Sequence, residues 1–167
     1  YQVPPLVCGG LAVVVSPLIA LMKDQVDGLR QVGVAAASLH CEQASGEQAS
    51  IMAAAGRGEL RLLYVTPERL VMPEFLCALA KMDTKWIAID EAHCISQWGH
   101  DFRPEYRRLA EVRAAIPNAS LHACTATATV RVRDDILAQL GLRDPLVLVG
   151  DIDRPNLTYR VTPRTDT

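Results

Sequence analysis

Two adjacent carboxylates and a nearby imidazole, those of Asp90, Glu91 and His93, follow the apolar run 86–89. If that run is a buried strand, both carboxylates stand at the edge of a sheet, where they can hold Mg²⁺ and orient an attacking water beside a nucleotide phosphate. The alternative is the solvated start of a helix, where acidic residues interact favourably with the helix dipole. The acid pair therefore indicates a nucleotide site only if other polar groups meet it at the same edge.

A second group of side chains follows a few residues later. Trp98, His100, Phe102 and Arg103 lie close together in a chain that is only 5% aromatic. Flat aromatic faces stack on nucleobases, and a neighbouring guanidinium binds phosphate or stacks as well. Composition alone favours a plainer alternative, in which the aromatic residues pin the loop onto the core.

One expected partner of the acid pair is missing from these residues. A phosphate-cradling loop reads Gly-x-x-x-x-Gly-Lys-Ser/Thr. The lysines, at positions 23, 81 and 85, do not follow glycine, and Gly9-Gly10 indicates only a turn. We therefore expect half of a nucleotide site here. The chain also lacks an initiator Met, so we expect it to be part of something longer.

Apolar runs predict six strands, and helical spacing between them predicts the crossovers. The predicted strands are 11–15, 34–39, 62–65, 86–89, 121–124 and 146–149. The first helix is expected to start at Ser16-Pro17, with Ser16 as its N-cap, and to stop near Gly33. Further helices are expected over 45–55 (with Ser45 and Gln48 as a capping box), 73–80, 104–115 and 130–140, the last ended by Gly141. This alternation predicts an α/β fold, a parallel sheet flanked by helices.

Polar clusters follow four of these strands. They are Ser16-Pro17, the run from Thr66 to Arg69, the run from Asp90 to His93, and Thr125-Ala126-Thr127. Ligands of open α/β sheets collect at the carboxyl ends of the strands, so these clusters are expected to meet. Turn and N-cap chemistry is the plainer role of Thr125 and Thr127, and capping of the strand end is that of His93.

Net charge, cysteine spacing and the length of apolar runs limit which classes of protein the chain can belong to. The chain has 167 residues, a net charge of −2 and five scattered cysteines. It contains no apolar run long enough to cross a membrane and no basic secretory start, and the cysteines form no Cys-x-x-Cys pair. We expect most of the cysteines to be reduced core residues, no membrane partner, and nucleic-acid contact, if any, through local geometry rather than a strong positive field.

The motifs together closely resemble the RecQ family of DNA helicases. The resemblance rests on Asp90-Glu91-Ala92-His93 with the loop from Cys94 to Tyr106, on the segments 14–26 and 64–70, on Thr125-Ala126-Thr127-Ala128, and on Asp153-Arg154-Pro155-Asn156. RNA helicases of the DEAD- and DEAH-box type share the acid pair but not that loop.

This resemblance implies a RecA-like P-loop NTPase domain, incomplete at its start, over residues 1–150, with a linker and the start of a second motor domain over 151–167. It implies ATP and Mg²⁺ as cofactors, with Asp90 on the metal directly or through water and Glu91 activating water. His93 would sense the γ-phosphate or couple it to the next polar cluster. The residues implied in coupling are Gln97, Trp98, His100, Phe102, Arg103, Thr125 and Thr127. Those implied in DNA binding are Ser16, Lys23, Gln25, Thr66, Arg69, Trp98, Phe102 and Arg103, with Glu68 orienting Arg69.

The implied partners are single-stranded and duplex DNA, and the implied activity is ATP-dependent 3′ to 5′ unwinding in recombination and repair. The expected location is the bacterial cytoplasm or a eukaryotic nucleus. Without the phosphate loop, we expect these residues alone to be inactive. The competing hypothesis is a non-catalytic nucleic-acid-binding module derived from a helicase. Arg107 and Arg108 are interpreted as a solvated helix face.

Overall fold

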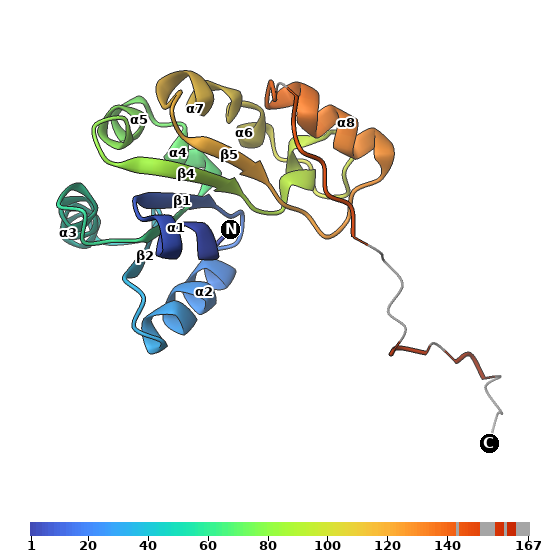
Figure 1. The fold of residues 1–167 in the computed structure, drawn as a ribbon, viewed down its shortest axis with the longest axis horizontal. Coiled ribbons are helices and arrows are strands. Elements are labelled where there is room, and N and C mark those ends of the chain that lie inside the picture. The colour runs from blue at the N-terminus through green and yellow to red at the C-terminus, as the bar shows by residue number, and fades with distance from the viewer. Residues whose placement is uncertain (143, 151–155, 159, 163–167) are drawn as a thin grey trace.

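The computed structural model describes residues 1–142, 144–150, 156–158 and 160–162. Its centre is a five-stranded sheet in the order β2-β3-β1-β4-β5, and every neighbouring pair is parallel (Figure 1). The strands are β1 (Leu11–Val15), β2 (Ala36–Leu39), β3 (Leu62–Val65), β4 (Thr84–Ile89) and β5 (Ser120–Ala123). The parallel α/β sheet expected from the sequence is confirmed.

Helices cover the two faces of the sheet unequally (Figure 1). They are α1 (Val3–Cys8), α2 (Ile19–Gln31), α3 (Ser45–Gly56), α4 (Pro67–Leu70), α5 (Pro73–Leu79), the 3-10 turn η1 (Ala92–Ile95), α6 (Pro104–Arg107), α7 (Ala110–Ala115) and α8 (Val130–Gln139). Val13, Val15 and Ile87 face the core shared with α3 to α8. Val14 and Tyr64 face a smaller core, closed by α2.

The strands are buried because they lie between helices. Every residue of β1 and of β3 is buried, which explains why both read as unbroken apolar runs. Within the described residues, no helix combines the length and the apolar character needed to cross a bilayer.

The start of α2 differs from expectation. The helix begins at Ile19 with Leu18 as N-cap, and not at Ser16-Pro17. The Ser16 N–H donates to the Val65 carbonyl oxygen (3.0 Å), so Ser16 continues the sheet and the chain turns only afterwards. The capping box at Ser45 is also wrong, because Ala44 is the N-cap and the Gln48 side chain donates to the Gln43 carbonyl oxygen instead.

Two further elements differ. The helix expected over 104–115 is divided into α6 and α7, because the backbone tightens there to i to i+3 hydrogen bonds, such as Leu109 N–H to the Tyr106 carbonyl. Short helices α1 and α4 were not expected. Both carry proline in their first turn.

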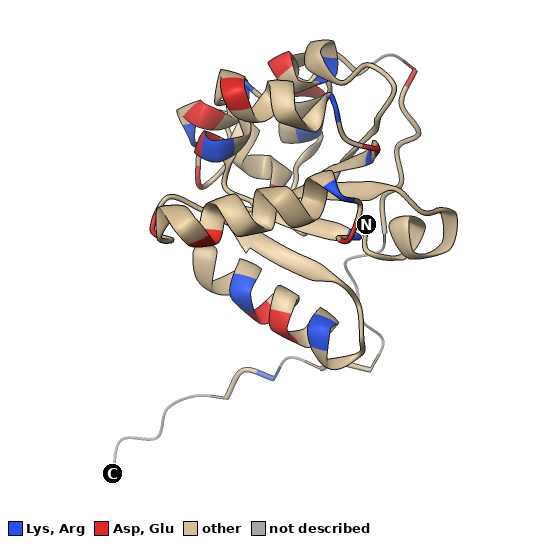
Figure 2. Ribbon diagram, turned by 90° about the vertical axis from the view of Figure 1, so that its left-hand side faces the viewer, with Lys and Arg blue, Asp and Glu red and all other residues tan. Residues whose placement is uncertain are grey.

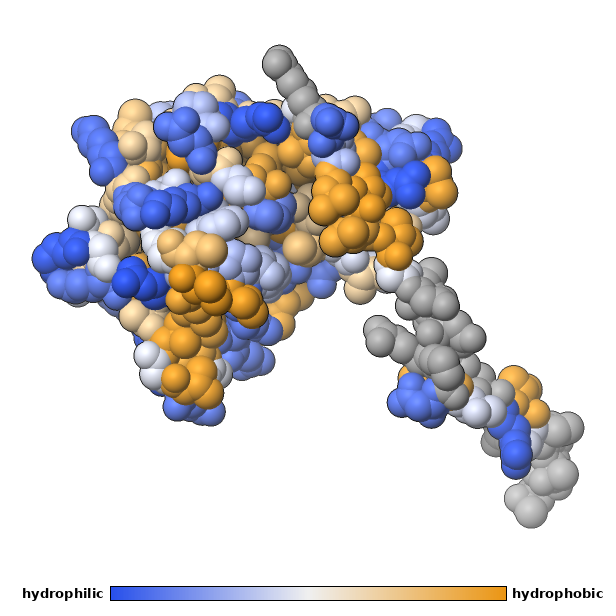
Figure 3. Space-filling view, viewed as in Figure 1, coloured by the Kyte–Doolittle hydropathy of each residue, from blue (hydrophilic) through white to orange (hydrophobic). Residues whose placement is uncertain are grey.

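The sixth strand, expected over 146–149, is wrong. Leu146 is 85% exposed and Leu148 is 84% exposed, and the segment pairs with no strand in the described part of the chain. An apolar run becomes a strand only where a neighbouring strand supplies hydrogen bonds, and no described strand pairs with this run. Figure 3 shows it as an apolar surface, with a second one at Val3 and Val7 of α1. Of the expected domain junction 151–156, residues 151–155 lie outside the described residues.

Candidate functional site

Backbone hydrogen bonds bring the ends of four strands side by side. Ser16 N–H donates to Val65 O (3.0 Å), Asp90 N–H donates to Val15 O (2.9 Å), and Cys124 N–H donates to Ile89 O (2.9 Å). The residues that follow β1, β3, β4 and β5 therefore occupy one edge. The meeting of polar clusters that the sequence predicts is present in the structure.

Asp90 sits at the centre of this edge, half-buried, with both carboxylate oxygens in hydrogen bonds. Its Oδ1 accepts from the Glu91 N–H (3.0 Å), and its Oδ2 accepts from the Tyr1 hydroxyl (2.9 Å). Burial, followed by the Asp90 carboxylate, raises the pKa of Tyr1, so the hydroxyl keeps its proton and donates it. A carboxylate has about four acceptor positions, so Asp90 retains capacity for another ligand.

Glu91 turns the chain sharply out of β4. Its φ of 47° and ψ of 43° lie in the left-handed region, which is uncommon for a residue other than glycine. The turn starts η1 at once and brings Glu91 Oε2 to 3.2 Å from His93 Nδ1. Glu91 is therefore held by backbone geometry that costs on the order of 1 kcal/mol.

His93 connects the acid pair to the segment after β5. Its ring is buried, Nδ1 lies 3.0 Å from Thr125 Oγ1, and the ring stacks on His100 with centroids 4.1 Å apart. Burial and then His100 lower the pKa of His93, against the opposing pull of Glu91 and Asp101. The imidazole is therefore neutral at pH 7. Because a carboxylate only accepts, its contact with Glu91 calls for the tautomer with hydrogen on Nδ1.

Thr125 completes this link. Its Oγ1 also accepts from the Thr127 N–H (3.2 Å), so the turn chemistry expected of the two threonines is present together with the contact to His93. Thr127 itself is exposed.

The loop 96–103 folds back over η1. The Arg103 N–H donates to Cys94 O (3.0 Å), and its guanidinium donates to Pro17 O (3.2 Å), beside the end of β1. A Cβ at Gly99 would overlap the His93 carbonyl oxygen, so only glycine fits there. The loop is thereby tied to the same edge as the acid pair.

The aromatic side chains of this loop face solvent instead of the core. Trp98 is 52% exposed and Phe102 is 37% exposed, and His100 is exposed apart from its stack on His93. The alternative, in which the aromatic residues pin the loop onto the core, therefore fails for Trp98 and Phe102. Exposed aromatic faces of this kind are available to a ligand.

Arginines that sequence reasoning passed over lie on these rings. The Arg131 guanidinium carbon lies 3.4 Å from the Trp98 ring centroid, and that of Arg107 lies 5.0 Å from the Phe102 centroid. Arg107 also donates to Gln97 Oε1 (3.3 Å). The adjacency of Arg107 to the loop was a usable signal, whereas nothing in the sequence places Arg131 beside Trp98.

The residues expected to bind DNA are only partly gathered. Ser16 and Thr66 are buried side by side at the edge, and Thr66 caps α4 by accepting from the Arg69 N–H (3.4 Å). Ser16 Oγ has no hydrogen-bond partner within the described residues. Arg69 lies over the Phe75 ring, 5.6 Å from its centroid, and its guanidinium contacts Met72 Sδ. Glu68, expected to orient Arg69, makes no hydrogen bond or ion pair to it in the described chain.

Lys23 and Gln25 lie on different faces of α2, because residues two apart in a helix are about 200° apart. Lys23 is exposed, whereas Gln25 Oε1 accepts from Gln2 Nε2 (2.6 Å), which also donates to the Tyr64 hydroxyl (2.8 Å). The structure thus places Gln25 beside α1 and apart from the loop. Along the ribbon in Figure 2, acidic and basic positions are interspersed.

The carboxylates fit a magnesium ion of the kind found with nucleotides. In the described chain, no three His, Cys, Asp or Glu residues gather as a metal cage. Mg²⁺ usually takes only one or two protein carboxylates and completes its shell with phosphate oxygens and water. Asp90, with free acceptor positions at a strand end, meets that requirement.

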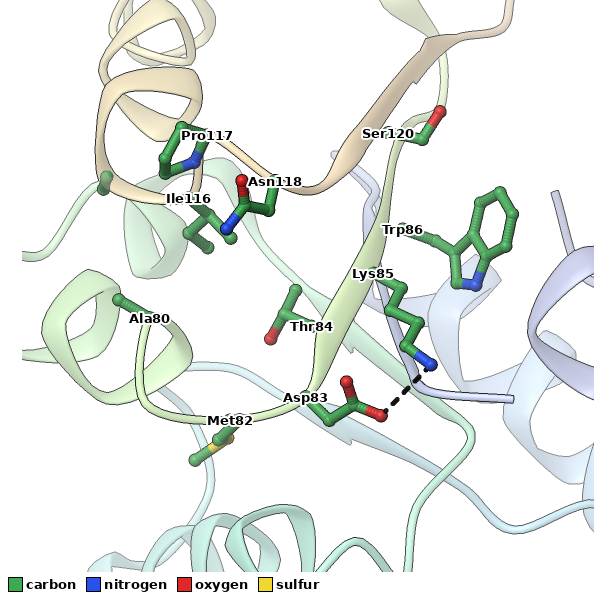
Figure 4. Close-up of a pocket in the computed structure, with 11 residues that line it drawn as sticks. Ala80, Met82, Asp83, Thr84, Lys85, Trp86, Ile116, Pro117, Asn118 and Ser120 are labelled. Carbon is green, nitrogen blue, oxygen red and sulfur yellow. Dashed lines mark ion pairs between the residues drawn. The ribbon is translucent and has the colours of Figure 1, made fainter. Parts of the chain in front are cut away.

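A pocket elsewhere is separate from this site. It lies at the amino-terminal ends of β4 and β5, where Asp83 and Lys85 form an ion pair (3.6 Å) near Trp86 and Asn118 (Figure 4). Strands run away from it toward Asp90, so it shares none of the polar clusters described above.

Comparison with known proteins agrees with this geometry. The sequence profile of the DEAD/DEAH box helicases matches residues 5–136. The ATP-dependent DNA helicase RecQ of Pasteurella multocida is 46% identical over 164 residues, covering 98% of this chain and 26% of the relative. That of Bacillus subtilis is 44% identical over 162 residues, covering 96% of this chain and 27% of the relative. The chain thus spans about a quarter of the length of these relatives.

Solved structures agree on the fold. The hypothetical ATP-dependent RNA helicase from Sulfolobus tokodaii has a TM-score of 0.61 at 18% identity, covering 84% of this chain and 40% of its own. The Pyrococcus furiosus Hef helicase domain has a TM-score of 0.59 at 17% identity, covering 80% of this chain and 27% of its own. The RecA-like fold expected from the sequence is confirmed.

Proposed function

The chain belongs to the DEAD/DEAH box helicase family, and we propose that it serves as the first motor domain of a RecQ-type enzyme. That enzyme would couple ATP hydrolysis to 3′ to 5′ unwinding of DNA in recombination and repair. The proposal is supported by the relatives named ATP-dependent DNA helicase RecQ and by the loop 96–103, whose His100 stacks on the His93 ring that faces Glu91. We propose the domain limits 1–150 and 151–167 on the same basis.

The observation that carries this proposal is the position of His93 between Glu91 and Thr125, at 3.2 Å and 3.0 Å. A merely solvated helix start does not bury a histidine against the end of a second strand. The arrangement suits a site in which a change at the nucleotide is passed to a neighbouring segment.

In this proposal each residue of the edge has a distinct task. Asp90 holds Mg²⁺ directly or through water, and the ion, when bound, neutralises charge on the phosphate oxygens. Glu91 orients the attacking water and accepts its proton. His93 keeps the Glu91 carboxylate in place through Nδ1 and shares that nitrogen with Thr125 Oγ1, so movement of Glu91 alters the contact with Thr125.

The proposed nucleic-acid partner is DNA, bound as a single strand at the loop and as duplex ahead of it. Trp98 and Phe102 offer ring faces for stacking, and Arg103 joins the loop to the end of β1 near Ser16. Stacking contributes about 1–3 kcal/mol per base and needs no strong positive field, which agrees with the net charge of −2. Ser16, Lys23, Thr66 and Arg69 remain the proposed backbone contacts, and the position of Gln25 gives it weaker support.

A second function is favoured by one specific observation. The 167 residues contain no Gly-x-x-x-x-Gly-Lys-Ser/Thr run, so the cradle for the β- and γ-phosphates is not among them. We propose that these residues alone turn over no ATP. We call the product of the complete reading frame that contains these residues the complete gene product. If the protein is a non-catalytic nucleic-acid-binding module, the complete gene product does not hydrolyse ATP either.

One experiment separates these proposals. ATP hydrolysis by the complete gene product is measured with and without single-stranded DNA, beside the 167-residue chain. The helicase proposal expects DNA-stimulated hydrolysis in the first and none in the second. Binding of DNA without hydrolysis by the complete gene product would support the binding module, and hydrolysis by the 167-residue chain would refute its proposed inactivity.

A further inference from the structure

Helix α8 contacts the loop 96–103 through two of its side chains. Arg131 and Asp135 are four residues apart in α8 (Val130–Gln139), so their side chains share one face of the helix. Val132 and Ile136 on the neighbouring face are buried in the core, which fixes how the helix is turned. The face with Arg131 and Asp135 lies along the loop, and each of the two residues contacts it.

The backbone of the loop is fixed by Asp135. Ser96 is fully buried, and its Oγ donates to Asp135 Oδ2 at 2.7 Å. The same Oγ accepts from the Trp98 N–H (3.2 Å), and the other carboxylate oxygen of Asp135 accepts from Gln139 Nε2 (3.2 Å). A chain of hydrogen bonds therefore runs from α8 to the main chain of Trp98.

The ring of Trp98 is fixed by Arg131. The guanidinium carbon lies 3.4 Å from the ring centroid, which is the separation of two stacked planar groups. Trp98 nevertheless remains 52% exposed, as expected of an indole with one face covered and the other open. Arg131 forms no ion pair within the described residues, so its charge is not neutralised by a carboxylate there.

We propose that Arg131 and Asp135 are positioning residues that present the open face of Trp98 to a nucleobase, so that guanidinium, indole and base form a three-layer stack. The inference rests on the proposed function, because it assumes that the loop receives single-stranded DNA. The two residues act on different parts of the loop: Asp135 holds the main chain in place through Ser96, and Arg131 holds the plane of the Trp98 ring. An aromatic ring already held in place loses less conformational freedom when a base stacks on it.

The stack itself is tested without DNA. The 167-residue chain contains two tryptophans, Trp86 and Trp98. When this chain carries Trp86→Phe, its tryptophan fluorescence comes from Trp98 alone. Arg131→Ala should uncover the second ring face and raise the acrylamide quenching constant. Arg133→Ala is the matched control, because Arg133 lies on the same helix and pairs with Asp134 instead. Equal quenching in both variants would overturn the proposal.

Binding is then measured by fluorescence anisotropy of a labelled oligothymidylate with the complete gene product. Arg131→Ala should raise Kd about five- to tenfold, and should change it little when Trp98 is already alanine. Asp135→Ala should weaken binding similarly, and Asp135→Asn should restore much of it, because the amide oxygen still accepts from Ser96. In an Arg133→Ala background, Trp98→Ala should raise the Kd for the oligonucleotide as much as it does in the unchanged protein.

Three results would overturn the inference. The first is that Arg131→Ala raises Kd by the same factor when Trp98 is already alanine. The second is that Arg131→Ala raises Kd no more than Arg133→Ala does. Tighter binding by Arg131→Ala would be the third, since it would mean that Arg131 occupies the place of the base. Failure of the proposed function has a different signature, in which the unchanged protein does not bind the oligonucleotide or Trp98→Ala binds it equally well.

Discussion

His93 Nδ1 lies 3.0 Å from Thr125 Oγ1, although the two residues are 32 positions apart in the chain. The contact spans the ends of β4 and β5, and it is made by the nitrogen that also faces Glu91. The acid pair and the segment after β5 therefore share one buried side chain. In the proposed function, this shared contact is the direct physical route between a nucleotide at the acid pair and the rest of the domain.

Removal of the Thr125 hydroxyl should break that route. In the complete gene product, we expect Thr125→Val to lower DNA-stimulated ATP hydrolysis at least about tenfold, and Thr125→Ser to retain most of it. The free energy of unfolding should fall by about 1 kcal/mol in the valine variant, since a methyl group in place of the hydroxyl leaves His93 without that partner. Steady-state hydrolysis assays with a DNA titration check the rates. Equal rates for the valine and serine variants would contradict the role of the hydroxyl.

His93 predicts a pH dependence of stability. Burial lowers its folded-state pKa from 6.5, so the unfolded chain binds the proton more readily. The unfolding free energy should therefore fall as the pH drops below about 6.5, and this group should have no effect at higher pH. Urea unfolding at pH 7.5, 6.5 and 5.5 measures it.

His122 supplies the control for that titration. Its pKa is also lowered, chiefly by desolvation, so His122→Gln should remove only its own share of the slope. His93→Gln should show a smaller loss of stability between pH 7.5 and 5.5 than the unchanged chain. An identical loss in both would rule out His93 as a source of the pH dependence.

Gly99 and Gly28 predict opposite effects of the same substitution. Gly99→Ala forces a methyl group into the His93 carbonyl oxygen, so we expect a loss of about 1–3 kcal/mol in the free energy of unfolding. Gly28 lies inside α2 with open space around it, so Gly28→Ala should stabilise by about 0.5–1 kcal/mol. Chemical denaturation of the two variants tests this, and a neutral Gly99→Ala would contradict the close packing of the loop on η1.

Trp98→Ala should uncouple DNA binding from the stimulation of ATP hydrolysis. Loss of one stacking ring is expected to raise the DNA concentration for half-maximal stimulation about tenfold and to abolish most of the stimulation in the complete gene product. Phe102→Ala is a useful comparison, because its ring is less exposed. An unchanged DNA-stimulated rate in Trp98→Ala would remove the loop from the coupling proposal.

Much of the fold was predictable because buried parallel strands read as apolar runs. Leu11–Val15 and Leu62–Val65 match β1 and β3 at both ends. The site at the carboxyl ends of the strands was predictable for a related reason. The residues that follow parallel strands all lie at the same end of the sheet. The run 146–149 is also apolar but pairs with no described strand and is exposed, and composition alone does not reveal that difference.

The contacts that hold the loop were beyond sequence reasoning. Ser96 and Asp135 are 39 positions apart, and only the packing of α8 brings them together. Ser-Pro is a common helix start, so the sequence predicts Ser16 as a helix cap. In the structure the Ser16 N–H donates to the Val65 carbonyl oxygen at the end of β3. Gly99 has no positive φ, and its need for glycine comes from a neighbouring carbonyl that the sequence does not place.

In the proposed function, Asp90 and Glu91 act on a magnesium-bound nucleoside triphosphate. The most direct measurement is DNA-stimulated ATP hydrolysis by the complete gene product carrying Asp90→Asn or Glu91→Gln, which keep the shape of each side chain and remove its charge. We predict that each variant loses hydrolysis about 100-fold or more while still binding single-stranded DNA. Hydrolysis at the unaltered rate in both variants would contradict the account.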